Sequence, residues 1–99
     1  MYARFTTIVF ASSEPDAAET IFRHVVPAVE ELPGFKGMVV LSGLDDRSLA
    51  TLTLWETEEA LEAAQPFLEG VKRAETSFRQ VEATDSARFY VAGARLTSR

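Results

Sequence analysis

The fold is decided by the stretch from Pro33 to Ala64, PGFKGMVVLSGLDDRSLATLTLWETEEALEAA. Phe35–Leu41 and Ser48–Trp55 are rich in β-branched and apolar residues, which is typical of strands. Residues 42–47 between them (SGLDDR) have turn chemistry and are short enough for a hairpin. Thr57 then caps a helix that begins with two glutamates, whose charge suits the positive N-terminal end of a helix. The stretch therefore predicts a strand, a hairpin turn, a second strand and a helix.

One strand and one helix are expected before this stretch. Ala3–Phe10 (ARFTTIVF) is rich in β-branched and aromatic residues, which predicts a strand. Residues 12–16 (SSEPD) supply a serine cap, a proline for the first turn and early acids, which is typical of a helix start. Pro27 is expected to kink this helix on the side opposite its apolar stripe, and Leu32–Gly34 ends it. The apolar stripe at helical spacing comprises Ala18, Ile21, Phe22, Val25, Val29 and Leu32.

A second helix and a last strand are expected around and after the end of the stretch. Pro66 is expected to split the helix and to leave Phe67–Arg79 as a separate helical piece. Residues 80–86 are predicted to be a connector, and Arg88–Leu96 (RFYVAGARL) the last strand. The order β-α-β-β-α-β predicts a single ferredoxin-like α+β domain over residues 1–99, with both helices on one face of a four-stranded antiparallel sheet.

Composition narrows the classes of function. The 99 residues include no cysteine and one histidine, which excludes disulfides and a thiolate nucleophile and argues against a metal site. The formal net charge of −5, with lysines and arginines scattered along the chain, argues against nucleic acid as a partner. No apolar run is long enough to span a membrane, and no signal peptide is visible. Together with the missing cysteines, these features predict a cytoplasmic protein.

The expected strands are apolar on both faces, which predicts a homodimer. One face of such a sheet is covered by helices, and the other should be polar if it meets water. Four exposed strands of this composition would instead form an apolar patch larger than soluble monomers usually carry, and a second subunit would cover it. On the third strand the two faces are Ala50, Leu52 and Leu54 against Thr51, Thr53 and Trp55, and on the first strand Ile8 and Phe10 against Phe5 and Val9.

The stretch from Pro33 to Ala64 resembles the antibiotic biosynthesis monooxygenase family. The resembling features are Pro33-Gly34-Phe35 after the first helix, the hairpin, and WETEEAL from Trp55. The resemblance implies a dimeric α+β barrel with a pocket between the helices and the sheet of each subunit. The family includes cofactor-free quinol oxygenases, haem-degrading enzymes and members without known activity.

The haem-degrading branch of the family is a poor match to this chain. Its members carry an Asn on the first strand and an iron-ligating His on the second helix, in addition to the Trp that this chain keeps as Trp55. Here Thr7 stands at the Asn position and the second helix has no His. Because imidazole is the usual axial ligand, neither haem nor any other cofactor is expected.

The resemblance also suggests a binding site for a small apolar or aromatic molecule. Trp55 matches a pocket Trp of the family and would stack on an aromatic ring; the alternative is a large core residue. If the strand parity of the family holds, one face of the sheet carries Thr7, Thr51, Thr53 and Trp55. Phe22 would project toward this face from the first helix. The resulting apolar pocket with a few hydroxyls would suit an aromatic polyketide or a quinol. The alternative is ordinary threonine in strands.

Two residues are candidates for the chemistry itself. His24, the only histidine, lies near the edge of the apolar stripe of its helix and would deprotonate a phenol near neutral pH. Arg95 lies on the expected last strand, and the resemblance suggests that such an arginine holds an oxyanion. Tyr90 on the same strand is a further candidate for substrate binding. The alternative for both His24 and Arg95 is a surface residue without a catalytic role.

Two functions of different classes follow. The first is a cofactor-free monooxygenase that binds an electron-rich phenol or quinol, removes its proton and lets the anion react with O₂. The second is a non-catalytic dimeric module that binds a small ligand or only assembles. The first requires a base inside the pocket, whereas the second requires only a cavity or a filled core.

Overall fold

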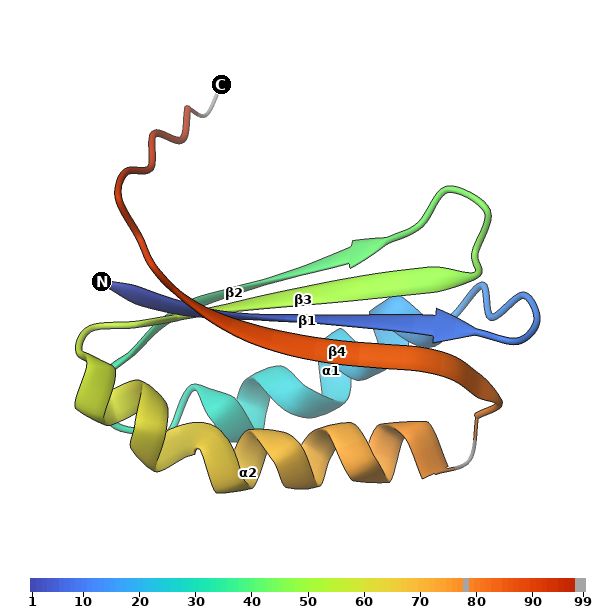
Figure 1. The fold of residues 1–99 in the computed structure, drawn as a ribbon, viewed down its shortest axis with the longest axis horizontal. Helices are drawn as coiled ribbons and strands as arrows, with labels where there is room; N and C mark the ends of the chain where they lie inside the picture. The colour runs from blue at the N-terminus through green and yellow to red at the C-terminus, as the bar shows by residue number, and fades with distance from the viewer. Residues whose placement is uncertain (78, 98–99) are drawn as a thin grey trace.

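The computed structural model describes residues 1–77 and 79–97, and confirms the expected order of elements. The predicted helical residue Phe78 and the last two residues of the predicted tail lie outside the described residues. Figure 1 shows the elements as β1 (Tyr2–Phe10), α1 (Ala17–Val29), β2 (Phe35–Ser42), β3 (Ser48–Trp55), α2 (Glu58–Ser77) and β4 (Val81–Tyr90).

The four strands form one antiparallel sheet in the order β2-β3-β1-β4, with both helices on the same face (Figure 1). This is the ferredoxin-like α+β fold that the sequence predicts. The two central strands pair Tyr2 with Trp55 at one end and Val9 with Ser48 at the other. Because side chains alternate along a strand, this register decides which residues of β1 and β3 face the helices.

Helix α1 begins later than the sequence suggests. Its N-terminal boundary residue is Asp16, which makes no side-chain cap, so the expected serine cap is wrong. The helix continues through Pro27 to Val29, and Pro27 lies on the exposed side, as expected. Val25 before Pro27 and Val29 after it are both buried, and this packing holds the helix together across the missing proline hydrogen bond.

Helix α2 is continuous from Glu58 to Ser77, so the predicted split at Pro66 is wrong. Pro66 is exposed, and the side chains buried on the opposite face, Leu61, Ala64 and Leu68, extend across it. A proline removes one helical hydrogen bond, which an anchored helix of 20 residues tolerates. The predicted cap is confirmed, because the Thr57 hydroxyl accepts a hydrogen bond of 3.1 Å from the backbone N–H of Ala60.

Strand β4 comprises Val81–Tyr90, so the prediction of a connector at 80–86 and a strand at Arg88–Leu96 is wrong. The strand pairs with β1 from Tyr2 to Phe10, and it is an edge strand. Edge strands tolerate polar residues. Because VEATDSAR is mostly polar, it lacks the apolar alternation from which a strand is predicted. Residues 91–97 have no regular secondary structure and lead away from the sheet on the side opposite the helices (Figure 1).

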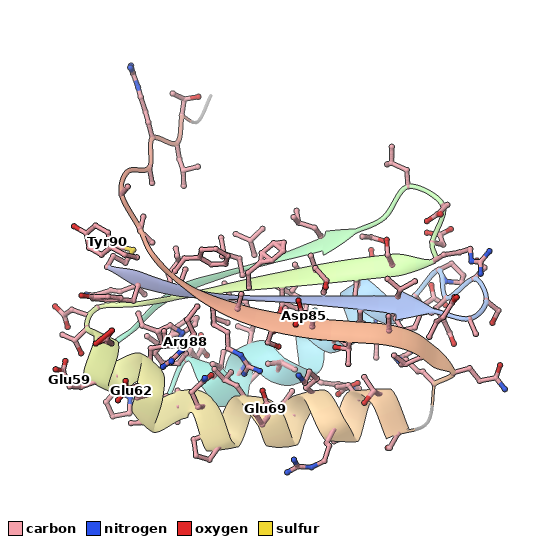
Figure 2. The ribbon with its side chains drawn as sticks, viewed as in Figure 1. Glu59, Glu62, Glu69, Asp85, Arg88 and Tyr90 are labelled. Atoms are coloured by element: carbon pink, nitrogen blue, oxygen red, sulfur yellow. The ribbon has the colours of Figure 1, made fainter. Side chains whose placement is uncertain are left out.

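The face of the sheet opposite the helices is open and apolar (Figure 2), as the strand patterns predict. A row of paired residues crosses all four strands at its centre: Val39, Leu52, Phe5 and Ala87. Val39 is 45% exposed, and Phe89 near the end of β4 is 54% exposed. The polar side chains of Thr7 and of its pairing partner Asp85 also lie on this face. The monomer therefore leaves a large apolar surface uncovered.

Candidate functional site

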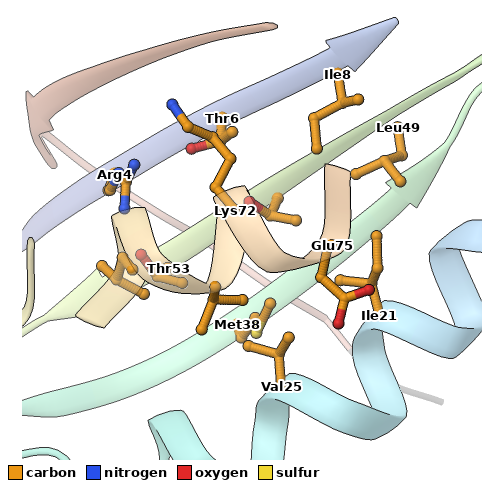
Figure 3. Close-up of a pocket in the computed structure, with 13 residues that line it drawn as sticks. Arg4, Thr6, Ile8, Ile21, Val25, Met38, Leu49, Thr53, Lys72 and Glu75 are labelled. Atoms are coloured by element: carbon orange, nitrogen blue, oxygen red, sulfur yellow. The ribbon is translucent and has the colours of Figure 1, made fainter. Parts of the chain in front are cut away.

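A small, partly open cavity lies between the sheet and the two helices (Figure 3). Its volume is about 50 Å³. A cavity of roughly 150 Å³ is known to bind benzene, so an aromatic ring enters this one only if flexible lining side chains such as Met38 and Lys72 move. The lining residues are Arg4, Thr6, Ile8, Ile21, Val25, Met38, Leu49, Thr51, Thr53, Leu68, Val71, Lys72 and Glu75.

One end of the cavity carries a network of charged and hydroxyl groups centred on Ser86 of β4. The guanidinium of Arg4 donates a 3.2 Å hydrogen bond to Ser86 Oγ, and Lys72 Nζ donates another of 3.2 Å. The carboxylate of Glu69 binds both cations: Oε1 accepts a hydrogen bond from Arg4 Nη2, and Oε2 lies 3.4 Å from Lys72 Nζ. Two positive charges thus share one carboxylate.

The two hydroxyls of this network leave one donor for a ligand. A hydroxyl has one O–H and two acceptor sites, and Arg4 and Lys72 occupy both acceptor sites of Ser86. Ser86 therefore donates its proton to Thr6 Oγ1, 2.9 Å away. The O–H of Thr6, which lines the cavity, remains available to a ligand oxygen.

Arg4 supplies a buried positive charge at this end. Its side chain is only 4% exposed. Desolvation by burial lowers the pKa of Arg4, and the charge of Glu69 raises it in the opposite direction. Because an arginine starts from so high a pKa, it stays protonated at any physiological pH.

A carboxylate lines another part of the same cavity. The Glu75 side chain is 13% exposed, and its Oε1 lies 4.0 Å from His24 Nδ1. Its Oε2 is buried and has no hydrogen-bond partner among the described residues. The cavity therefore combines apolar walls, hydrogen-bond donors from Thr6 and Lys72, and one free acceptor.

The predicted face of β3 is confirmed, but its two site candidates lie in different surroundings. Thr53 lines the cavity. Trp55 is fully buried beside it, packs edge-on against Phe35 with ring centroids 5.6 Å apart, and is absent from the cavity wall. The indole Nε1–H of Trp55 donates a 3.0 Å hydrogen bond to Thr53 Oγ1, which leaves the Thr53 O–H free to donate.

Two other candidates point away from the cavity. Thr7 lies on the open face of the sheet, exposed and paired with Asp85, so the expected shared face with Thr53 is wrong by one position. Thr6 occupies the inward position instead, because a shift of one residue turns a strand side chain to the other face. Phe22 is 44% exposed, and the residues of α1 that line the cavity are Ile21 and Val25.

The remaining candidates lie at the edge of the site or outside it. The side chain of His24 is 67% exposed and reaches the site only through Glu75. Tyr90 is 68% exposed at the end of β4 (Figure 2), where its ring packs edge-on against Tyr2 at 5.5 Å. Arg95 lies in the exposed segment after β4, away from the cavity, because the strand ends five residues before it.

The sequence reasoning missed the charged residues of the site. Arg4 is an inward-facing cation on a strand whose other inward positions are mainly apolar, and this break in the alternation was the available signal. Lys72 and Glu75 continue the helical stripe of Leu68 at spacings of four and seven. Within the described residues, no three His, Asp or Glu side chains gather as a metal site would require, and no described helix is long and apolar enough to cross a membrane.

The fold is that of the antibiotic biosynthesis monooxygenase structures, as the resemblance suggested. No family model and no curated protein matches the sequence. A structure described as an antibiotic biosynthesis monooxygenase from Deinococcus radiodurans aligns with a TM-score of 0.73, at 13% identity over 100% of both chains.

Two further solved structures carry named activities. A monooxygenase from the gene ActVA-Orf6 of Streptomyces coelicolor, in complex with the ligand nanaomycin D, aligns with a TM-score of 0.71 at 19% identity, over 98% of this chain and 92% of that one. SnoaB of Streptomyces nogalater, a cofactor-independent oxygenase (N63A mutant), aligns with a TM-score of 0.69 at 19% identity, over 94% of this chain and 95% of that one. At these identities the likeness concerns the fold.

Proposed function

We propose that this protein is a cytoplasmic, cofactor-free monooxygenase that acts on a small aromatic or quinol-type substrate. The observation that carries the proposal is the cavity between the sheet and the helices, which combines apolar walls with the hydroxyls of Thr6 and Thr53 and the ammonium of Lys72. Such donors suit the oxygen of a phenolate, and their strength grows where water is excluded. The likeness to the fold of a cofactor-independent oxygenase supports the same function.

The proposed reaction needs no group beyond substrate, O₂ and protein. A quinol loses a proton, and its electron-rich anion reacts with O₂ at a ring carbon. One oxygen atom stays on the ring and the other leaves as water, so that quinol and O₂ give a hydroxyquinone and water. In this scheme the chain binds the ring between apolar side chains, stabilises the anion through Lys72 and the two threonines, and excludes bulk water.

The active form is proposed to be a homodimer in which the open faces of two sheets pack together. The exposed apolar side chains of that face support this arrangement, since an obligate interface resembles a protein core that has been cut in half. The cavity lies on the other face of the sheet, so each subunit would keep a complete site.

Oxygen uptake by metal-depleted protein tests the proposed activity. With 1,4-dihydroxynaphthalene and a chelator, uptake above the buffer rate is expected, and Lys72→Met should lower it about 100-fold because a donor to the developing anion is lost. Lys36→Met is the matched control, since Lys36 is 46% exposed on β2 and away from the cavity. Uptake equal to buffer alone, or equal in both variants, would contradict the proposal.

A small-ligand-binding or assembly module without catalysis is the second candidate. The cavity volume of about 50 Å³ favours it, because such a space is closer to that of a few ordered waters than to that of a ring. The rate of 1,4-dihydroxynaphthalene oxidation distinguishes the two candidate functions. A non-catalytic module does not accelerate this oxidation, whether or not it binds the compound.

A further inference from the structure

Glu75 holds a buried carboxylate oxygen that the described part of the fold does not use. The residue lies on α2, and its side chain lines the cavity with 13% of its surface exposed. Its Oε2 has no hydrogen-bond partner among the described residues. Leaving a buried acceptor without a partner costs free energy, so a molecule that donates a hydrogen bond is expected at Oε2.

The surroundings of Glu75 fix which of its two oxygens is free. Oε1 faces His24 of α1 at 4.0 Å, on the side where the imidazole reaches solvent. Figure 3 shows the Glu75 side chain on α2, close to Ile21 and Val25 of α1, which also line the cavity. Oε1 therefore lies at the outer edge near the imidazole, and the buried Oε2 is left for a molecule inside.

The positive charges of the site are already engaged elsewhere. Arg4 hydrogen-bonds Glu69 and Ser86, and Lys72 lies against the same two residues. Among the described residues no cation of the cavity pairs with Glu75, whereas Lys72 keeps the third N–H of its ammonium group as a donor for a ligand anion. This separation of an acceptor from donors within one apolar cavity is the arrangement that proton abstraction requires.

We propose that Glu75 is the base of the site: Oε2 takes the proton from a ring hydroxyl, or from a C–H beside a carbonyl, of an aromatic ligand in the cavity. This assignment rests on the proposed function, which requires a proton acceptor inside the pocket. The O–H or C–H bond breaks, its electron pair stays on the ligand as a phenolate or enolate, and the carboxylate becomes a carboxylic acid. The donors of Lys72, Thr6 and Thr53 stabilise the ligand anion. The proton then returns to solvent past the exposed imidazole of His24.

Solvent exchange in the absence of O₂ tests this step apart from oxygenation. The probe is 2-indanone, whose C–H groups lie between an aromatic ring and a carbonyl; their replacement by deuterium in D₂O is followed by NMR under argon. Wild-type protein should accelerate the exchange, and Glu75→Gln should reduce the acceleration at least 100-fold, as is typical for loss of a general base. Glu59→Gln, an exposed glutamate on the same helix, should stay within twofold of wild type.

The outcomes separate the base from the proposed oxygenase. If Glu75→Gln exchanges as fast as wild type, or if wild type does not accelerate the exchange at all, the assignment of the base is overturned. If exchange is fast and depends on Glu75 while O₂ uptake is absent, the assignment stands and the oxygenase proposal fails. If circular dichroism shows that Glu75→Gln folds poorly, Glu75→Asp is the second variant. It keeps the carboxylate group but shortens the side chain by one methylene, so it should retain partial exchange. Full exchange in Glu75→Asp would contradict the proposal.

Discussion

Replacing Val39 by Asp should separate the proposed dimer into monomers. Val39 begins the apolar row that crosses the open face through Leu52, Phe5 and Ala87, and it remains 45% exposed in the monomer. Full burial of a valine contributes roughly 1.5 kcal/mol, so covering the exposed part contributes about 0.7 kcal/mol per subunit.

The larger effect of Val39→Asp is desolvation of the new carboxylate. Burying an unpaired charge costs several kcal/mol per ion, and a symmetric interface would bury two. With about 3 kcal/mol per carboxylate, the two contributions sum to roughly 7 kcal/mol per dimer, which corresponds to an increase in Kd of about 10⁵-fold. The monomer should stay folded, because Val39 lies on an edge strand where a charged side chain is tolerated.

Sedimentation equilibrium measures this change directly. Wild type is expected at twice the chain mass of 10.9 kDa, and Val39→Asp at the chain mass itself. Leu44→Asp is the control, since Leu44 is fully exposed in the hairpin turn after β2 and should leave the dimer intact. A wild-type monomer at micromolar concentration, or a Val39→Asp dimer of unchanged Kd, would refute the packing of open faces.

Three more changes test the core and the site. Gly34→Ala should lower the free energy of unfolding by about 2 kcal/mol or more in urea titration, because Gly34 has φ +80° and a Cβ there would lie 2.5 Å from the Cβ of Ala60; an unchanged midpoint would contradict this. Trp55→Phe should lower the free energy of unfolding by about 1–2 kcal/mol. It should change the affinity for 1,4-dihydroxynaphthalene less than about threefold in calorimetry of folded protein, because Trp55 does not line the cavity. A larger loss of affinity would show that Trp55 belongs to the binding site. Met38→Ala should tighten binding of the same ligand by enlarging the cavity, and weaker binding at full folding would show that the ligand lies elsewhere.

The strands and helices around the hairpin were predictable because their signals are local. Phe35–Leu41 and Ser48–Trp55 differ from the observed β2 and β3 by at most one residue, and Thr57 caps α2 as expected. β4 was not predicted because this edge strand carries polar residues. Its stability comes from pairing with β1, and a local sequence pattern does not reveal such pairing. The unbroken α2 at Pro66 likewise depends on tertiary packing.

The candidate site was harder to predict than the fold. The alternation of side chains along β3 correctly predicted that Thr53 faces the helices. On β1 the predicted inward residue was wrong by one position, so that Thr7 was expected where the structure has Thr6. Arg4 breaks the inward apolar pattern of its strand, but only its partners from α2 and β4 show that the cation is buried and paired. Glu75 is one of many glutamates in the chain, and only its burial and free oxygen distinguish it.

The most direct test of the account is the fate of the two oxygen atoms of ¹⁸O₂ in the oxidation of 1,4-dihydroxynaphthalene. Cofactor-free monooxygenation in the cavity predicts 2-hydroxy-1,4-naphthoquinone with one ¹⁸O from O₂, formed by metal-depleted protein, with the second ¹⁸O in water. Uncatalysed autoxidation instead gives 1,4-naphthoquinone and labelled hydrogen peroxide. Mass spectrometry that finds only the unhydroxylated quinone, formed at the rate of buffer alone, would contradict the central claim.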